Sequence, residues 1–270
     1  MNNARQAVLE YLSAQNQLLT NAQGDLVGRA ADMKLLGLAC EMIDQFVNPG
    51  LYSELTLEQR LDRLLKRQES SLATARFDRM YRLSKLPHKK WINQIKAAPD
   101  RGLHPDLLIK LTETKYLEEG VNIVLSGAAG VGKTTLSVAA GMQALTNGYQ
   151  VRFFRMFDLA TMLELKDDAS FSRFLDSMAR TRLLIIDDWG QELLSEHVLV
   201  RLNEIAERRY GVGSTMVTTH LLKDSLGSVA EKSTAVLDAL MDRLFRESDI
   251  YVTLTGSSFR GKADEIRGTK

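Results

Sequence analysis

The stretch "LSGAAGVGKTTLS", Leu125 to Ser137, decides the fold of this 270-residue chain. Its segment from Gly127 to Thr134 matches the phosphate-binding pattern G-x-x-x-x-G-K-[ST], and it follows a predicted strand and opens a predicted helix. Glycines let the backbone curl so that N–H groups face phosphate oxygens, and the start of the helix adds its positive end. The stretch therefore predicts a nucleotide site in an α/β domain.

The residues of this loop have separate expected roles. Lys133 is expected to reach the β and γ phosphates of ATP, and the Thr134 hydroxyl is expected to bind Mg²⁺. The full nucleotide-binding set is Gly127, Ala128, Ala129, Gly130, Val131, Gly132, Lys133, Thr134 and Thr135. The alternative is a glycine-rich turn without a ligand, which the strand and helix on either side disfavour.

Short β-prone runs alternate with longer helical segments after residue 120. The runs are "VNIVLS", "VRFFR", "RLLIID", "STMVTT" and "DIYVTL". Such alternation predicts a central parallel sheet flanked by helices. We therefore expect a P-loop α/β domain over residues 101–270.

The chain before this domain has apolar residues at helical spacing only. Leu57, Leu61 and Leu65 illustrate the pattern, and Thr56 followed by Gln59 has the form of a capping box that starts a helix. We expect a small all-helical domain over residues 1–100, which ends within the proline-containing segment "AAPDRGLHPD".

A second motif, "RLLIIDD", ends in two carboxylates. A buried parallel strand delivers such groups to the carboxyl edge of the sheet, where nucleotides bind. Asp187 is expected to hold the magnesium, and Asp188 is expected to polarise the attacking water. The alternative is that both are acidic turn residues after an apolar strand.

Composition points to a globular protein of the cytoplasm. The apolar fraction is 44%, and the single cysteine, Cys40, cannot form an internal disulfide. No export signal and no run of about 18 apolar residues is present, so we expect no membrane partner.

Charge is distributed unevenly along the chain. Residues 60–96 contain eleven Lys or Arg against three Asp or Glu, a net charge of +8 within a chain of net charge +1. A cationic helix face opposite the leucines would bind DNA phosphates without reading sequence. The expected DNA-binding residues are Arg60, Arg63, Lys66, Arg67, Arg76, Arg79, Arg82, Lys85, Lys89 and Lys90. The alternative is an ordinary solvated helix face.

Five motifs together resemble one family. "GAAGVGKTTL", "LLIIDDWG", "STMVTTH", "LMDRLF" and "SSFRGK" occur in the order seen in the IstB-like AAA+ ATPases, which are helpers of insertion-sequence transposition and relatives of DnaC-type helicase loaders. The N-terminal portion is also similar to the helical domain that precedes the ATPase in that family. The resemblance covers most of the chain.

The resemblance implies roles for three further residues. His220 stands at the sensor I position, where the family usually has a polar amide. Arg243 matches the arginine presented to the nucleotide of a neighbouring subunit, and Arg260 matches the sensor II arginine of the same subunit. Many relatives have glutamate at the position of Asp188. The alternative for Arg243 is an ion pair with Glu247 one helical turn away, and the alternative for Arg260 is an exposed cation after a strand.

The resemblance also implies a function. It predicts an ATP-hydrolysing transposition helper that forms a homo-oligomer with ATP at its subunit interfaces, assembles on duplex DNA, deforms it and recruits a partner transposase. A helicase loader that binds single-stranded DNA is one alternative. A scaffold in which ATP is only a structural ligand is another.

Overall fold

The computed structural model describes residues 10–11, 14, 19–230 and 234–258. The chain divides into two compact units, Met1–Arg79 and Met80–Lys270. Within the described residues no helix combines the length and apolar character needed to cross a membrane.

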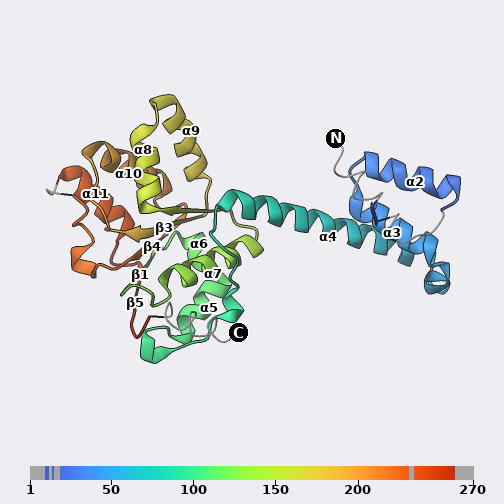
Figure 1. The fold of residues 1–270 in the computed structure, drawn as a ribbon, viewed down its shortest axis with the longest axis horizontal. Coiled ribbons are helices and arrows are strands. Elements are labelled where there is room, and N and C mark those ends of the chain that lie inside the picture. Colours follow the sequence, from blue (N-terminus) through green and yellow to red (C-terminus); the bar gives the residue numbers. More distant parts are fainter. Residues whose placement is uncertain (1–9, 12–13, 15–18, 231–233, 259–270) are drawn as a thin grey trace, which may run out of the picture. The chain divides into compact units, whose positions relative to one another are not determined.

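The second unit contains a five-stranded parallel sheet in the order β2-β3-β4-β1-β5 (Figure 1). Its strands are β1 (Ile123–Gly127), β2 (Val151–Arg155), β3 (Leu183–Trp189), β4 (Ser214–Thr219) and β5 (Ile250–Leu254). Each strand coincides with one of the five predicted β-prone runs, so the predicted parallel sheet flanked by helices is confirmed. All strands end at one edge because all pairs are parallel, and the loops at that edge can share a site.

Helices cover both faces of this sheet (Figure 1). The helices of the second unit are α5 (Pro105–Glu113), α6 (Lys115–Glu119), α7 (Lys133–Thr146), α8 (Met156–Leu165), α9 (Asp168–Ala179), α10 (Glu196–Arg209) and α11 (Ala235–Leu244). Helix α7 contacts β1, β2, β3 and β4 from one face. Helices α8 to α11 share a hydrophobic core with the other face, in which Leu184, Ile186 and Val217 are fully buried. Burial on both faces explains why these strands are continuous apolar runs rather than alternating ones.

The N-terminal unit is helical, as predicted. It contains α2 (Asn21–Asp32), α3 (Leu36–Val47) and the first part of α4 (Leu57–Ser84), with a short 3₁₀ helix over Pro49–Tyr52. The expected capping box starts α4, because the Thr56 N–H donates to Gln59 Oε1 and the Gln59 N–H donates to Thr56 Oγ1. Val27, Ala39 and Ile43 form the centre of a small apolar cluster between α2 and α3.

The contact between α3 and α4 is polar rather than apolar. Arg63 Nε lies 3.2 Å from a carboxylate oxygen of Glu41, which is 4% exposed, and Arg67 lies 3.9 Å from the same carboxylate. Arg60 Nε donates to Gln45 Oε1 at 3.2 Å. Buried Glu41 therefore holds Arg63 and Arg67 against α3, because a buried carboxylate needs a partner.

This packing bears on the predicted cationic face opposite the leucines of α4. Leu57, Leu61 and Leu65 are exposed by 69%, 48% and 59%, so they are not core residues of the described unit. The arginines at positions 60, 63 and 67 face α3, where Arg63 and Arg67 are partly neutralised by carboxylates and Arg60 bonds the uncharged Gln45 side chain. The helical period of α4 was predictable, but the face that packs was not, because it depends on the acidic residues of α3.

The predicted domain boundary also differs from the observed division. Residues 80–100 cluster with the second unit rather than with the N-terminal helices. Ala98 and Leu103 form an antiparallel bridge, and the Arg101 guanidinium donates to the carbonyls of Thr255 and Ser257 just after β5. The proline-containing segment is therefore part of the α/β unit.

The close approach of α3 to α4 predicts opposite effects for two Gly→Ala changes. A Cβ on Gly37 would lie 2.4 Å from the Arg67 carbonyl oxygen, so we expect Gly37→Ala to destabilise this unit by about 1–3 kcal/mol. Gly28 in α2 has no atom within 4 Å of such a Cβ, so Gly28→Ala is expected to stabilise it by about 0.5–1 kcal/mol. Amide hydrogen exchange of α3 and α4 measures both; equal effects would contradict the packing.

Candidate nucleotide-binding site

The phosphate loop begins where β1 passes close to β5. Gly127 has φ +141°, and a Cβ there would lie 2.1 Å from the Leu254 carbonyl oxygen. Only glycine fits both this backbone conformation and this contact. The Lys133 ammonium donates to the carbonyls of Gly127 and Ala128 at 2.7 and 2.9 Å, so it lies across the loop. The loop residues predicted from the motif are thus brought together as a cradle at the start of α7.

Thr134 and Asp187 meet at the carboxyl edge of the sheet. Thr134 Oγ1 donates to the Asp187 carboxylate, at 3.0 Å from each oxygen. Thr218 donates to the same carboxylate from β4, which lies between β1 and β3 in the sheet. Asp187 is 3% exposed. The two side chains predicted to hold magnesium are therefore in direct contact, although 53 residues separate them.

The environment of Asp187 opposes its charge. Burial and the nearby Asp188 raise the pKa of its carboxyl group, whereas hydrogen bonds from Thr218 and Thr134 lower it. The net effect is a raised pKa. A carboxylate held at this cost is typical of a functional site, since a cation brought beside it would remove the penalty.

These residues fit a magnesium–nucleotide complex. Hydroxyl and carboxylate oxygens are ligands that Mg²⁺ prefers, and it usually completes its shell with water and phosphate oxygens. Among the described residues no group of three His, Cys, Asp or Glu is placed to hold a metal ion. Thr134 and Asp187 would therefore hold the metal together with phosphate groups in the adjacent cradle.

Asp188 has an unusual backbone conformation. Its φ of +63° is in the left-handed region, and the β3–β4 register shifts between Ile186 and Trp189. The Asp188 N–H donates to Thr218 Oγ1 at 3.1 Å. Such a conformation costs on the order of 1–3 kcal/mol in a non-glycine residue and is enriched at functional sites. The bulge turns consecutive carboxylates apart, with Asp187 directed at Thr134 and Asp188 lining the pocket.

A pocket of about 1040 Å³ opens beside the phosphate loop. Its walls include Asp188, Gln191 and His220 at the sheet edge and residues 94–98 from the segment before α5. Ile95, Leu103 and Leu254 add apolar surface, and Lys90, Lys96 and Arg101 add positive charge. The pocket therefore offers an apolar wall beside a cationic phosphate cradle. Sequence reasoning placed a domain boundary in residues 97–106 and missed the role of residues 94–98 in this pocket.

The predicted site residues outside the loop have different placements. His220 is exposed and lines the pocket with Asp188. Arg243 donates to Asn203 Oδ1 and to the Ala239 carbonyl, and its described ion pair is with Glu207 of α10 rather than with Glu247. Arg260 lies outside the described residues.

Two contributors to the site were not assigned a role from the sequence. Thr218 binds both Asp187 and the Asp188 backbone, and Gln191 lines the pocket. A signal for Thr218 existed in the sequence, because hydroxyl residues recur in the otherwise apolar strand "STMVTT" and a buried polar side chain needs a partner.

The predicted DNA-binding residues divide into groups. Arg60, Arg63 and Arg67 face α3, and Lys66 pairs with Asp62. Lys89 lies over the Tyr81 ring, and Lys90 lines the nucleotide pocket. The remaining members, Arg76, Arg79, Arg82 and Lys85, are exposed, and no described carboxylate forms a salt bridge with them.

The fold and the site define the class of protein. A five-stranded parallel sheet with a phosphate loop after β1 and two carboxylates at the end of β3 is a P-loop domain of the AAA+ class. Similarity to known proteins narrows this class. The family model described as "IstB-like ATP binding protein" matches residues 28–266. The chain belongs to this family.

Relatives come from several bacteria. The insertion sequence ATP-binding protein y4pL of Sinorhizobium fredii is 30% identical over 229 residues, which cover 84% of this chain and 92% of the relative. The insertion sequence IS1162 ATP-binding protein of Pseudomonas fluorescens is 31% identical over 191 residues, which cover 70% of this chain and 82% of the relative.

Solved structures show the same fold at low identity. DnaI superposes with a TM-score of 0.52 and 21% identity, over 64% of this chain and 91% of that one. AMPPCP-bound DnaA from Aquifex aeolicus superposes with a TM-score of 0.51 and 20% identity, over 69% of this chain and 57% of that one. At these identities the likeness concerns the fold alone.

The raised pKa of Asp187 predicts a stability gain when its charge is removed. A carboxyl with a raised native pKa stabilises the fold below its unfolded pKa, and that contribution is lost as pH rises through the native pKa. Asp187→Asn should therefore raise the melting temperature of the nucleotide-free protein at pH 7 and flatten its decline with pH above 4, as measured by calorimetry.

The same variant should lose most of the stabilisation that Mg²⁺ and ATP add to the wild type. Thr112→Val, which changes a hydroxyl on exposed α5, is the control and should change neither quantity. A lower melting temperature for Asp187→Asn at pH 7 would contradict the electrostatic interpretation.

Proposed function

We propose that this protein is an ATP-hydrolysing helper of insertion-sequence transposition. It assembles as a homo-oligomer on duplex DNA, deforms the DNA and recruits or activates a partner transposase. The observation that carries the ATPase part is the contact between Thr134 and Asp187 beside the phosphate loop. The names of its relatives as insertion-sequence ATP-binding proteins support the biological setting.

The residues of the site would divide the work of hydrolysis. The loop amides and Lys133 would bind the phosphates, and the Thr134 hydroxyl and Asp187 would hold the metal. Asp188 lines the same pocket and would orient the attacking water. Bound magnesium ATP supplies the transferable phosphoryl group and two positive charges that offset the phosphate charge. Ile95, Leu103 and Leu254 would contact the base.

Arg243 would complete the site of a neighbouring subunit. An arginine supplied in trans is worth about 10³-fold or more in rate. ATP would then bind between subunits, and a ligand that binds only the assembled form stabilises the assembly by mass action. Hydrolysis would therefore control how long the oligomer stays on DNA.

The second half of the basic segment would provide the contacts to DNA. Arg76, Arg79 and Arg82 are exposed and follow one another at a spacing of three along α4. Their charges are available for DNA phosphates. Bending DNA costs on the order of 1–6 kcal/mol, and the phosphate contacts of several subunits together would offset this cost.

ATPase rate and assembly size test this proposal when each is measured with duplex DNA, with single-stranded DNA and without DNA. We expect duplex DNA to raise both quantities in the presence of Mg²⁺ and ATP, because binding and assembly are linked. Lys133→Ala should abolish nucleotide binding and assembly. A response to single strands alone would favour a helicase loader, and binding without hydrolysis under all conditions would favour a nucleotide-gated scaffold.

Two matched sets of arginines test the DNA surface. Replacing Arg76, Arg79 and Arg82 with Gln should weaken duplex binding and lower the slope of log K against log salt by up to about 0.9 per lost phosphate contact. Replacing Arg60, Arg63 and Arg67 with Gln should change the slope less, because Arg63 and Arg67 face carboxylates of α3 and Arg60 bonds the Gln45 side chain there. Fluorescence anisotropy between 50 and 200 mM salt gives both slopes. Equal slopes for the two sets would refute this division.

A further inference from the structure

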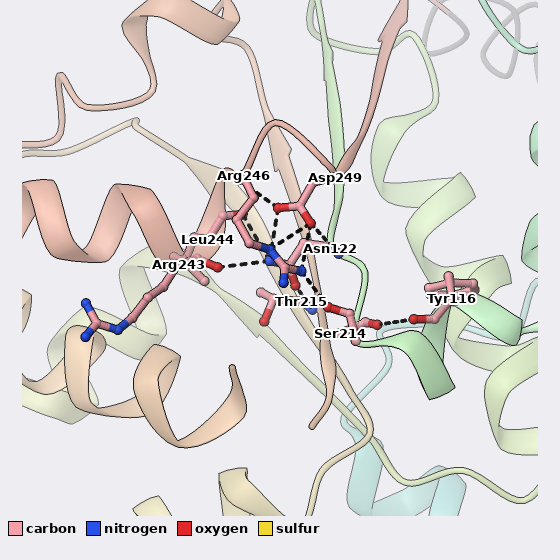
Figure 2. A network of polar contacts seen from close by, with 9 residues as sticks. Tyr116, Asn122, Ser214, Thr215, Arg243, Leu244, Arg246 and Asp249 are labelled. Atoms are coloured by element: carbon pink, nitrogen blue, oxygen red, sulfur yellow. Dashed lines mark hydrogen bonds and ion pairs between the residues drawn. The ribbon is translucent and has the colours of Figure 1, made fainter. Parts of the chain in front are cut away.

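Asn122 connects three elements at the edge of the sheet opposite the phosphate loop (Figure 2). It immediately precedes β1 and is 4% exposed. Its Nδ2 donates to the carbonyls of Arg243 and Leu244 at 3.1 and 3.3 Å, and its Oδ1 accepts from the Thr215 N–H on β4 at 2.8 Å. One side chain therefore joins the start of β1, the start of β4 and the end of α11.

An ion pair braces this asparagine. Asp249 accepts from the Asn122 backbone N–H at 2.9 Å and from its Nδ2 at 3.2 Å. Arg246 Nη2 lies 2.8 Å from the Asp249 carboxylate, and the same guanidinium donates to the Gly120 carbonyl. The Asn122 side-chain amide is therefore held in one orientation, with both of its polar atoms paired.

The carbonyls that Asn122 binds belong to the last two residues of α11. Carbonyls in the final turn of a helix have no partner within the helix, so an external donor decides where that end lies. Figure 2 shows the Arg243 carbonyl end facing Asn122 while its guanidinium extends away from the cluster. That guanidinium contacts Asn203 and Glu207 of α10. Asn122 thus anchors the backbone from which the Arg243 side chain projects.

We propose that Asn122 is a positioning residue for Arg243, and that it sets where this arginine is presented to the neighbouring subunit. The inference rests on the proposed function, in which Arg243 acts in trans. Because Asn122 also starts the strand that carries the phosphate loop, it ties the position of the outgoing arginine to the subunit's own nucleotide site. Misplacement of a reacting group by about 1 Å can cost about 100-fold in rate.

Mixed assemblies separate this role from general support of the fold. A Lys133→Ala subunit keeps Arg243 but lacks a working phosphate loop, and an Arg243→Ala subunit has the opposite defect. An Asn122→Ala subunit should keep its phosphate loop and present Arg243 badly. Its ATP affinity should stay within about twofold of the wild type while the ATPase rate of its unmixed assembly falls by up to about 100-fold.

The pairing of variants gives the decisive result. Mixing Asn122→Ala with Lys133→Ala should raise the ATPase rate above that of either variant alone, because intact loops meet intact arginines. Mixing Asn122→Ala with Arg243→Ala should give no rise. The reverse pattern, or a rise in neither mixture, would overturn the proposal, since Asn122 would then support its own phosphate loop or the whole fold.

Two controls test the trans arrangement and the specificity of the Asn122 effect. Mixing Lys133→Ala with Arg243→Ala must itself raise the rate; failure there would refute the trans arrangement rather than the role of Asn122. Ser214→Ala removes a buried hydroxyl at the start of β4 that bonds the Tyr116 carbonyl and not α11, so it should behave as wild type in both mixtures. If Asn122→Ala does not fold, Asp249→Asn weakens the brace, because it removes one acceptor oxygen and the charge that pairs with Arg246, and it should give the same pairing pattern to a lesser degree.

Discussion

The hydrogen bonds that converge on the Asp187 carboxylate are the interaction on which the site depends. Thr134 reaches it from the start of α7, and Thr218 reaches it from β4, which lies between β1 and β3. Because α7 begins and β3 and β4 end at the same edge of a parallel sheet, a displaced strand would separate the phosphate loop from its carboxylate. The buried position of Asp187 raises the pKa of its carboxyl group, and a cation beside the carboxylate would remove this penalty.

The two edges of the sheet have different tasks. At the carboxyl edge, polar side chains gather around the phosphate loop and leave room for a ligand. At the opposite edge, Asn122, Asp249 and Arg246 pair with one another and with backbone groups, so that the ends of β1, β4 and α11 are held together. Strands β1 and β4 take part at both edges. They connect the nucleotide site to the helix that carries Arg243.

The N-terminal unit shows where a charge pattern misleads. The period of α4 and its capping box at Thr56 are local properties, and both were predictable. The face of α4 that packs against α3 was not predictable, because it depends on the buried Glu41 of α3 and not on the sequence of α4. An arginine row that suggests a polyanion surface in sequence can therefore serve partly to neutralise a neighbouring helix. For the exposed arginines farther along α4, contact with DNA phosphates stays a prediction.

The sequence by itself determined the class of fold and the chemistry of the phosphate loop. The five strands are apolar runs whose period is local, and the loop motif specifies backbone conformations that only glycine adopts easily. The tertiary structure alone decided that Thr218 holds Asp187, that residues 94–98 line the pocket and that Asn122 anchors α11. These contacts join segments that are about 30 to 160 residues apart in the chain, and their partners are backbone groups or common side chains. Strand order brings them together, and no local pattern encodes it.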